Sequence, residues 1–110
     1  MSATSAWLVL AVAGILEIIW AMALKYSDGF TRLVPSLVTV VAAAASFWLL
    51  ALALRVLPVG TAYAAWTGIG AVGAAVLGMV LLDEPRSAMR IACIVLIVAG
   101  IAGLNITSTR

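Results

Sequence analysis

Three long stretches of this 110-residue chain, residues 33–54, 56–82 and 91–109, contain no charged side chain. A fourth, residues 6–24, contains only Glu17. Each is long enough for a helix that crosses a hydrocarbon core of about 30 Å, which takes about 20 apolar residues. Because backbone in lipid must satisfy its own hydrogen bonds, these stretches are expected to be α-helices. The sequence therefore predicts an all-α integral membrane protein with four transmembrane helices.

The composition supports this class and excludes several others. Hydrophobic residues make up 66% of the chain and charged residues only 9%, whereas soluble domains have about 25% charged residues. The chain has no histidine, and its single cysteine, Cys93, lies in an apolar stretch. We therefore expect no metal site and no intrachain disulfide. The six basic residues are scattered between the stretches, so no basic face for nucleic acid is expected.

The chain is expected to form one domain, residues 1–110. Turn residues separate four predicted helices within it, at about 6–25, 33–54, 60–82 and 88–106. Ser27-Asp28-Gly29 ends the first helix, and Pro35, Pro58 and Pro85 all fall at helix boundaries. Proline is tolerated there because the first turn of a helix leaves its N–H groups unpaired.

Basic residues are almost evenly divided between the two sides that four spans would define. One side carries Arg55 and Arg110, with the N-terminal amine as a third positive group, and the other carries Lys25, Arg32, Arg86 and Arg90. Lys/Arg asymmetry sets the orientation of membrane proteins, and this difference is too small to fix one. The chain could insert both ways, which would permit an antiparallel dimer; a single orientation is the alternative.

Glu17 lies near the middle of the first predicted helix. A charged residue at the centre of a membrane helix costs about 2.5–3.5 kcal/mol on insertion scales and usually faces a protein interior or a water-filled cavity. No other charge lies at membrane depth to pair with it. Glu17 is therefore the strongest functional candidate, and a neutral Glu17 hydrogen-bonded within the bundle is the structural alternative.

Small residues and one indole surround Glu17 at helical spacing. These neighbours are Ala13, Gly14, Trp20 and Ala21. Small residues let a helix or a ligand approach closely, and Trp20 could stack on a cation through its π face. A role for Trp20 as an interfacial anchor is the alternative.

The third predicted helix carries a similar stripe. Its members are Tyr63, Trp66, Thr67, Gly70, Ala74 and Gly78. Gly68, Gly70 and Gly73 could also form a bending point, although glycine is common in membrane helices. Tyr63 and Trp66 as interfacial belt residues are the alternative interpretation.

The second and fourth predicted helices contribute less polar chemistry. Ser46 could orient a carboxylate through its hydroxyl, or could only bond back to its own helix. In the fourth helix, no polar side chain other than that of Cys93 lies between Arg90 and Asn105. Its small residues Cys93, Gly100 and Gly103 suggest helix association rather than substrate contact.

Four helices cannot easily enclose a hydrated pathway while also packing on one another. One carboxylate per chain in a groove of small residues therefore suggests a dimer that holds two copies of Glu17 close together. Desolvation and like-charge proximity would both favour the protonated form. If a proton and a cation compete for the same carboxylates, each displaces the other, which is a mechanism for proton-coupled cation export.

Along essentially its whole length the chain resembles the small multidrug resistance family of four-helix bacterial transporters. The matching segments are Gly14-Ile-Leu-Glu17, residues 24–31 (LKYSDGFT), Pro35-Ser36, residues 57–70 (LPVGTAYAAWTGIG) and Glu84. The resemblance implies a multi-pass protein of the bacterial inner membrane that forms an antiparallel, dual-topology homodimer. It also implies exchange of protons for cations by alternating access, driven by the proton-motive force without a cofactor.

The resemblance further implies roles for individual residues. Glu17 would be the essential carboxylate, Tyr63 a tyrosine near the site and Trp66 a tryptophan that stacks on the substrate. The fourth helix would be the dimerisation helix, although Cys93 stands where the family's glycine stripe begins.

The segment Glu17-Ile-Ile-Trp20 resembles the guanidinium-exporter branch of the family, because the quaternary-ammonium branch usually has a smaller residue at the position of Trp20. Ser46 also matches that branch, where a serine hydrogen-bonds the central glutamate. This comparison implies that Gly14, Glu17, Trp20, Ser46, Tyr63 and Trp66 form the binding site for protons and a guanidinium-like cation.

Two other functions stay open at this stage. One is a polyspecific exporter of quaternary-ammonium and other drug cations, and the other is an accessory membrane subunit that does not transport alone. An enzyme has the least support, because Ser46 has no candidate base beyond Glu17 and no cofactor motif is present.

Overall fold

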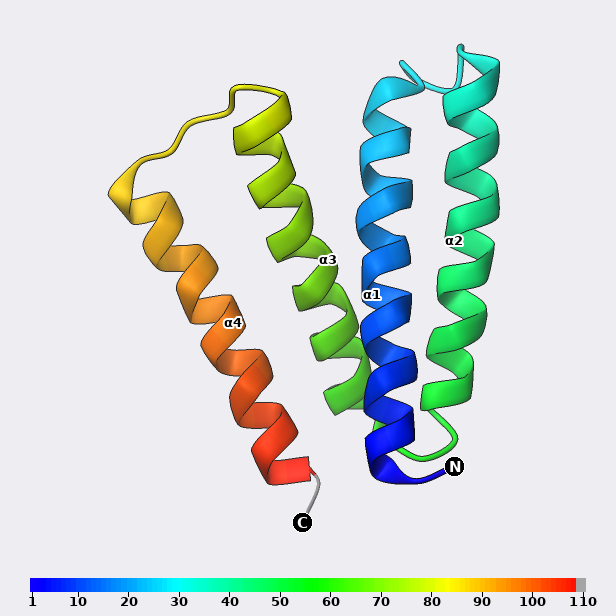
Figure 1. Cartoon of the computed structure of the whole chain (residues 1–110), viewed down its shortest axis with the longest axis vertical. Coiled ribbons are helices and arrows are strands. Elements are labelled where there is room, and N and C mark those ends of the chain that lie inside the picture. Colours follow the sequence, from blue (N-terminus) through cyan, green and yellow to red (C-terminus); the bar gives the residue numbers. More distant parts are fainter. Residues whose placement is uncertain (109–110) are drawn as a thin grey trace.

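The computed structural model describes residues 1–108 and contains four helices over that range (Figure 1). They are α1 (Ala3–Tyr26), α2 (Leu33–Ala53), α3 (Val59–Leu81) and α4 (Ala88–Ser108). All four are long and apolar enough to cross a membrane, so the expected all-α arrangement of four spans is confirmed. Arg110, which entered the charge balance, lies outside the described residues.

Local capping sets the ends of α1. The helix begins at Ala3, earlier than predicted, because the Ser2 hydroxyl accepts a hydrogen bond from the Ser5 N–H at 3.1 Å and so satisfies one of the unpaired N–H groups of the first turn. At the other end the buried Ser27 hydroxyl donates to the Leu24 carbonyl and accepts from the Phe30 N–H. The chain then turns through three residues with positive φ, Asp28, Gly29 and Phe30.

The helices lie side by side in a thin layer. The molecule measures 44 × 34 × 16 Å along its principal axes, and a single helix with its side chains is about 10–12 Å across. In Figure 1, α1 lies between α2 and α3, and α4 lies beyond α3. The contacts agree: α1 packs against both α2 and α3, whereas α4 packs mainly on α3.

The buried core belongs to the first three helices and the turn between α2 and α3. It consists of Ala6, Leu10, Ala13, Leu50, Ala53, Leu57, Ala62, Ala65 and Trp66. None of the α4 residues in its membrane-spanning window is buried within the described chain. The three-helix body α1–α3 therefore has its own core, while α4 is attached along one side.

The start of α1 and the end of α4 lie at the same end of the layer as the α2–α3 turn, and the two other turns lie at the opposite end (Figure 1). Lys25, Arg32, Arg86 and Arg90 are at or next to the α1–α2 and α3–α4 turns. The fold thus places these four basic residues at the same end of the layer, as four consecutive spans require.

Candidate functional site

The carboxylate of Glu17 lies against the backbone of α3. A Cβ atom added at Gly70 would overlap the Oε1, Cδ and Cγ atoms of Glu17, so the absence of a side chain at Gly70 is what admits the carboxylate. Glu17 is nine residues before the end of α1, which places it about 14 Å from that end at about 1.5 Å per residue. The structure therefore puts the acidic group deep within a span.

One oxygen of this carboxylate is buried without a partner. Glu17 Oε1 makes no hydrogen bond to any of residues 1–108. Buried polar atoms in proteins almost always have a partner, and each exception calls for an explanation. The indole Nε1 of Trp20, three residues further along α1, is likewise buried without a partner in the described chain.

Close approach at the other glycines brings the helices together around Glu17. Gly14 on α1 admits Ile69 of α3, and Gly73 on α3 admits Ile18 of α1. Gly68 faces the other way and admits Ile101 of α4. α3 runs continuously from Val59 to Leu81, so Gly68, Gly70 and Gly73 act as contact points in this conformation, and bending at them stays a prediction.

Ser46 is bound differently from what the sequence suggested. Its buried hydroxyl donates to the Ala13 carbonyl of α1 at 2.7 Å and accepts from the Trp66 Nε1 of α3 at 2.9 Å. Because a hydroxyl has one proton, the expected hydrogen bond from Ser46 to Glu17 is not made in this structure. Ser46 instead joins α1, α2 and α3 and holds the Trp66 ring.

Four aromatic rings form a continuous series across the three-helix body. Trp20 on α1 stacks with Phe47 on α2 at a centroid distance of 6.4 Å, and Phe47 meets Trp66 at 5.2 Å. Trp66 then contacts Tyr63 at 5.7 Å. The sequence did not single out Phe47, because it lies, next to Ser46, in a long stretch without charged residues.

Trp66 and Tyr63 differ in their surroundings. Trp66 is only 4% exposed, which disfavours a role as an interfacial belt residue, whereas Tyr63 is 56% exposed. The buried Trp66 thus lies between two exposed rings, those of Phe47 and Tyr63. Aromatic faces in such a position can contact a cation or its apolar substituents.

The residues assigned to dimer packing face open space. A Cβ atom added at Gly100 or Gly103 would meet nothing within 4 Å in the described chain, and Cys93 is exposed. Small residues on an open helix face allow a second helix to pack closely. The chain by itself does not use this surface.

Together these features define a class: a four-span membrane protein with one acidic group inside its spans. Residues 5–97 match the family model described as Small Multidrug Resistance protein. The chain belongs to the small multidrug resistance family. Family membership and the four spans make it a multi-pass protein of the bacterial inner membrane.

Several curated relatives match over nearly the whole chain. A protein named guanidinium exporter from Yersinia pseudotuberculosis serotype I (strain IP32953) is 61% identical, covering 94% of this chain and 99% of the relative. The guanidinium exporter of Escherichia coli (strain K12) is 57% identical, with 93% and 97% covered. That of Citrobacter freundii is 56% identical, with the same coverage.

Proposed function

We propose that this chain is a proton-coupled exporter of guanidinium and small guanidinyl cations. The observation that carries the proposal is the carboxylate of Glu17, which lies within a membrane span against Gly70 with one buried, unpartnered oxygen. Relatives that are 56–61% identical bear the name guanidinium exporter, and this supports the choice of cation.

The chemistry of the site suits a planar cation. Guanidinium presents N–H donors in one plane, a geometry that matches carboxylate oxygens in pairs. Trp20, one turn from Glu17, offers its π face to the cation. The series Trp20–Phe47–Trp66–Tyr63 supplies a wall that holds the cation against the carboxylate.

Coupling follows from competition for Glu17. A proton on the carboxylate removes the negative charge that holds the cation, and a bound cation disfavours protonation. If the site opens alternately to each side of the membrane, protons entering on one side are exchanged for cations leaving on the other. The direction of net transport is then set by the proton gradient, and no cofactor is needed.

We further propose an antiparallel homodimer that brings two copies of Glu17 to one site. The nearly even division of basic residues between the two sides allows both orientations. The open face of α4 at Cys93, Gly100 and Gly103 provides a surface for the second chain, and two carboxylates suit one guanidinium better than one does.

The deciding experiment is transport of guanidinium into proteoliposomes driven by a proton gradient. Glu17→Gln should fold and dimerise but lose coupled transport entirely, whereas Asp28→Asn removes an exposed loop carboxylate and should behave as wild type. Guanidinium binding to wild type should weaken as the pH falls, because protonation of Glu17 removes the charge that binds the cation. Proton-driven transport that survives Glu17→Gln would contradict the proposal.

The aromatic series favours one second candidate within transport, an exporter of quaternary-ammonium and other substituted cations, because aromatic faces bind such ions. Competition among guanidinium, methylguanidinium and tetraethylammonium for the purified protein separates the two. Transport by the chain reconstituted alone would exclude an accessory subunit that works only with a partner.

A further inference from the structure

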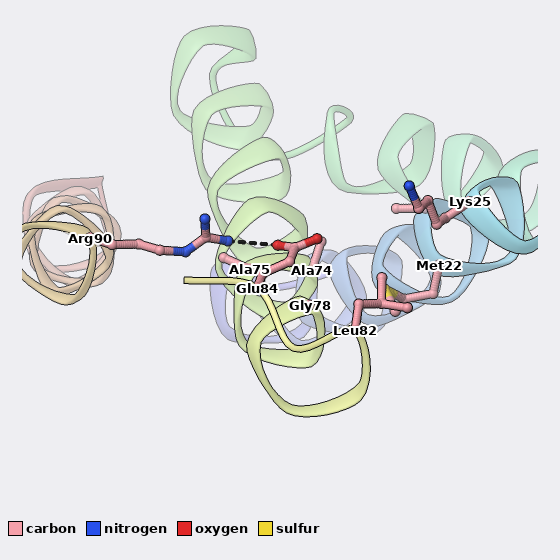
Figure 2. Close-up of a pocket in the computed structure, with 9 residues that line it drawn as sticks. Met22, Lys25, Ala74, Ala75, Gly78, Leu82, Glu84 and Arg90 are labelled. Carbon is pink, nitrogen blue, oxygen red and sulfur yellow. Dashed lines mark hydrogen bonds and ion pairs between the residues drawn. The ribbon is translucent and has the colours of Figure 1, made fainter. Parts of the chain in front are cut away.

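A second carboxylate, that of Glu84, lies beyond Glu17 near the ends of α1 and α3, against Gly78. A pocket of about 320 Å³ opens between the ends of α1 and α3, lined by Ala21 and Lys25 of α1, Ala74 and Gly78 of α3, Glu84 of the α3–α4 turn and Arg90 of α4. Figure 2 shows Glu84 between Arg90 on one side and Met22 and Lys25 on the other.

Residues that line the pocket lie on the same faces of α1 and α3 as Glu17 and Gly70. On α1, Ala21 lies one turn beyond Glu17; on α3, Ala74 lies one turn beyond Gly70 and Gly78 two turns beyond it. One turn is about 5.4 Å. The carboxylate of Glu17 packs against Gly70, and that of Glu84 packs against Gly78. A Cβ atom added at either glycine would overlap the carboxylate beside it.

The Glu84 carboxylate already holds a guanidinium group. Arg90 Nη2 lies 2.8 Å from Glu84 Oε1, and both side chains are partly exposed, at 32% and 39%. The Nε of Arg90 is buried without a partner among the described residues, so the pairing with Glu84 uses only the Nη2 nitrogen of the guanidinium. This contact is the same chemistry that the transported cation would use.

We propose that the pocket is an entry site, in which a free guanidinium ion exchanges with the Arg90 side chain on the Glu84 carboxylate as it passes to or from Glu17. This inference rests on the proposed function and adds a second binding residue to it. Because Arg90 is tethered beside Glu84, it competes with the ion, so the ion is held weakly and released readily.

The other charge that lines the pocket acts in the same direction. Lys25 lies on the α1 wall and is exposed, and its ammonium group repels a cation. With Arg90 and Lys25 present, a free cation binds the Oε1 atom of Glu84 only by taking the place of Arg90. The site is therefore expected to affect the concentration dependence of transport and not equilibrium binding at Glu17.

The test measures initial rates of guanidinium transport in proteoliposomes against guanidinium concentration. Glu84→Gln should raise the apparent KM about two- to fivefold, the size of a partly exposed charge contact, with the maximal rate unchanged. Arg90→Gln should lower the apparent KM by a similar factor, because it removes the competitor and leaves the carboxylate. Asp83→Asn and Arg32→Gln make the same charge changes at exposed positions that do not line the pocket, and they should leave the KM unchanged.

A purely structural ion pair predicts a different pattern. Either substitution would break the pair, so both would change KM or the maximal rate in the same direction, and this result would overturn the proposal. If Glu84→Gln does not fold, the sign of the Arg90→Gln effect decides alone. Absence of guanidinium transport by wild type would overturn the proposed function, whereas Glu17-dependent transport with shifts in one direction would overturn only the entry site.

Discussion

Three glycines in the middle of α3 and the two glycines of α4 have different surroundings. On α3, each of Gly68, Gly70 and Gly73 admits a side chain from a neighbouring helix of the same chain. On α4, Gly100 and Gly103 meet nothing in the described residues. The same residue type at similar spacing thus builds a site in one helix and leaves a free surface in the other.

This contrast divides the molecule into two structural parts. The body of α1, α2 and α3 contains the core, the Ser46 hydrogen bonds and the seat of Glu17. α4 adds the residues Ile97 and Ile101, which pack at Gly68, and turns its small residues outward. We therefore expect substitutions in the body to change cation handling and substitutions in α4 to change assembly.

Among substitutions at the glycines, the largest effect is expected at Gly70. In Gly70→Ala the new methyl group overlaps the Glu17 carboxylate, which must move because it is the flexible end of its side chain. Guanidinium transport should fall by at least about tenfold, since a misplacement of about 1 Å can cost on the order of 100-fold. Thermal stability should change little, because alanine favours the helix by about 1 kcal/mol relative to glycine, and this gain opposes the cost of moving the Glu17 side chain.

Gly73→Ala is the matched control for that prediction. The added methyl group there displaces Ile18 instead of a carboxylate, so packing is disturbed without moving Glu17. Rates of transport by the two variants, measured together with their unfolding temperatures, separate the two effects. Equal losses in both would mean that packing between α1 and α3, and not the position of the carboxylate, limits transport.

A somewhat smaller effect is expected on the open face of α4. Gly100→Val should weaken self-association about tenfold, since an overpacked contact costs about 1–3 kcal/mol. Ala99→Val makes a similar change at an adjacent exposed position about 100° around the helix, and should associate like wild type. Cross-linking or single-molecule dimerisation in bilayers measures the self-association of both variants. If Gly100→Val associated like wild type, α4 would not be the dimer surface.

The sequence could predict the four spans because charges and prolines mark their ends. It could also identify Glu17 because no other charge lies at membrane depth. It could not assign the facing sides of the helices. In helices that are apolar all round, no polar face indicates which side is buried, so the contacts of Phe47 and Ser46 were missed or misassigned.

Ser46 shows what packing adds to composition. The sequence suggested a bond to Glu17, and both the hydroxyl and the carboxylate do lie on faces of small residues. The structure instead satisfies the hydroxyl with Ala13 and Trp66. Which of several partners a hydroxyl takes depends on the rotation of its helix about its own axis by a few tens of degrees. The spacing of residues along the sequence does not determine how each helix is rotated relative to its neighbours.

Loss of the Ser46 hydroxyl should have a moderate effect on the three-helix body. Ser46→Ala leaves the Trp66 indole without its partner and removes the Ser46 bond to the Ala13 carbonyl, which should cost about 1–3 kcal/mol of unfolding free energy. Thr39→Val is the control, because the Thr39 hydroxyl bonds only to Pro35 within α2. Unfolding in mild detergent, with tryptophan fluorescence as the probe, compares them; equal stability of both variants would show that the Ser46 bonds do not hold the helices together.

The smallest expected effect concerns selectivity at Trp20. Trp20→Thr removes the ring that stacks on Phe47 and the π face next to Glu17. The lost cation–π contact, worth about 0.5–1 kcal/mol at a partly exposed site, weakens the binding of both cations, whereas the smaller threonine leaves room for the bulkier tetraethylammonium. The preference for guanidinium over tetraethylammonium should therefore fall about two- to fivefold. Cys93→Ala, on the open face of α4, should leave that preference unchanged, because α4 is assigned to assembly. If Cys93→Ala changed selectivity as much as Trp20→Thr did, the division between a cation-handling body and an assembly helix would fail; if neither did, the carboxylate alone would set the choice of cation.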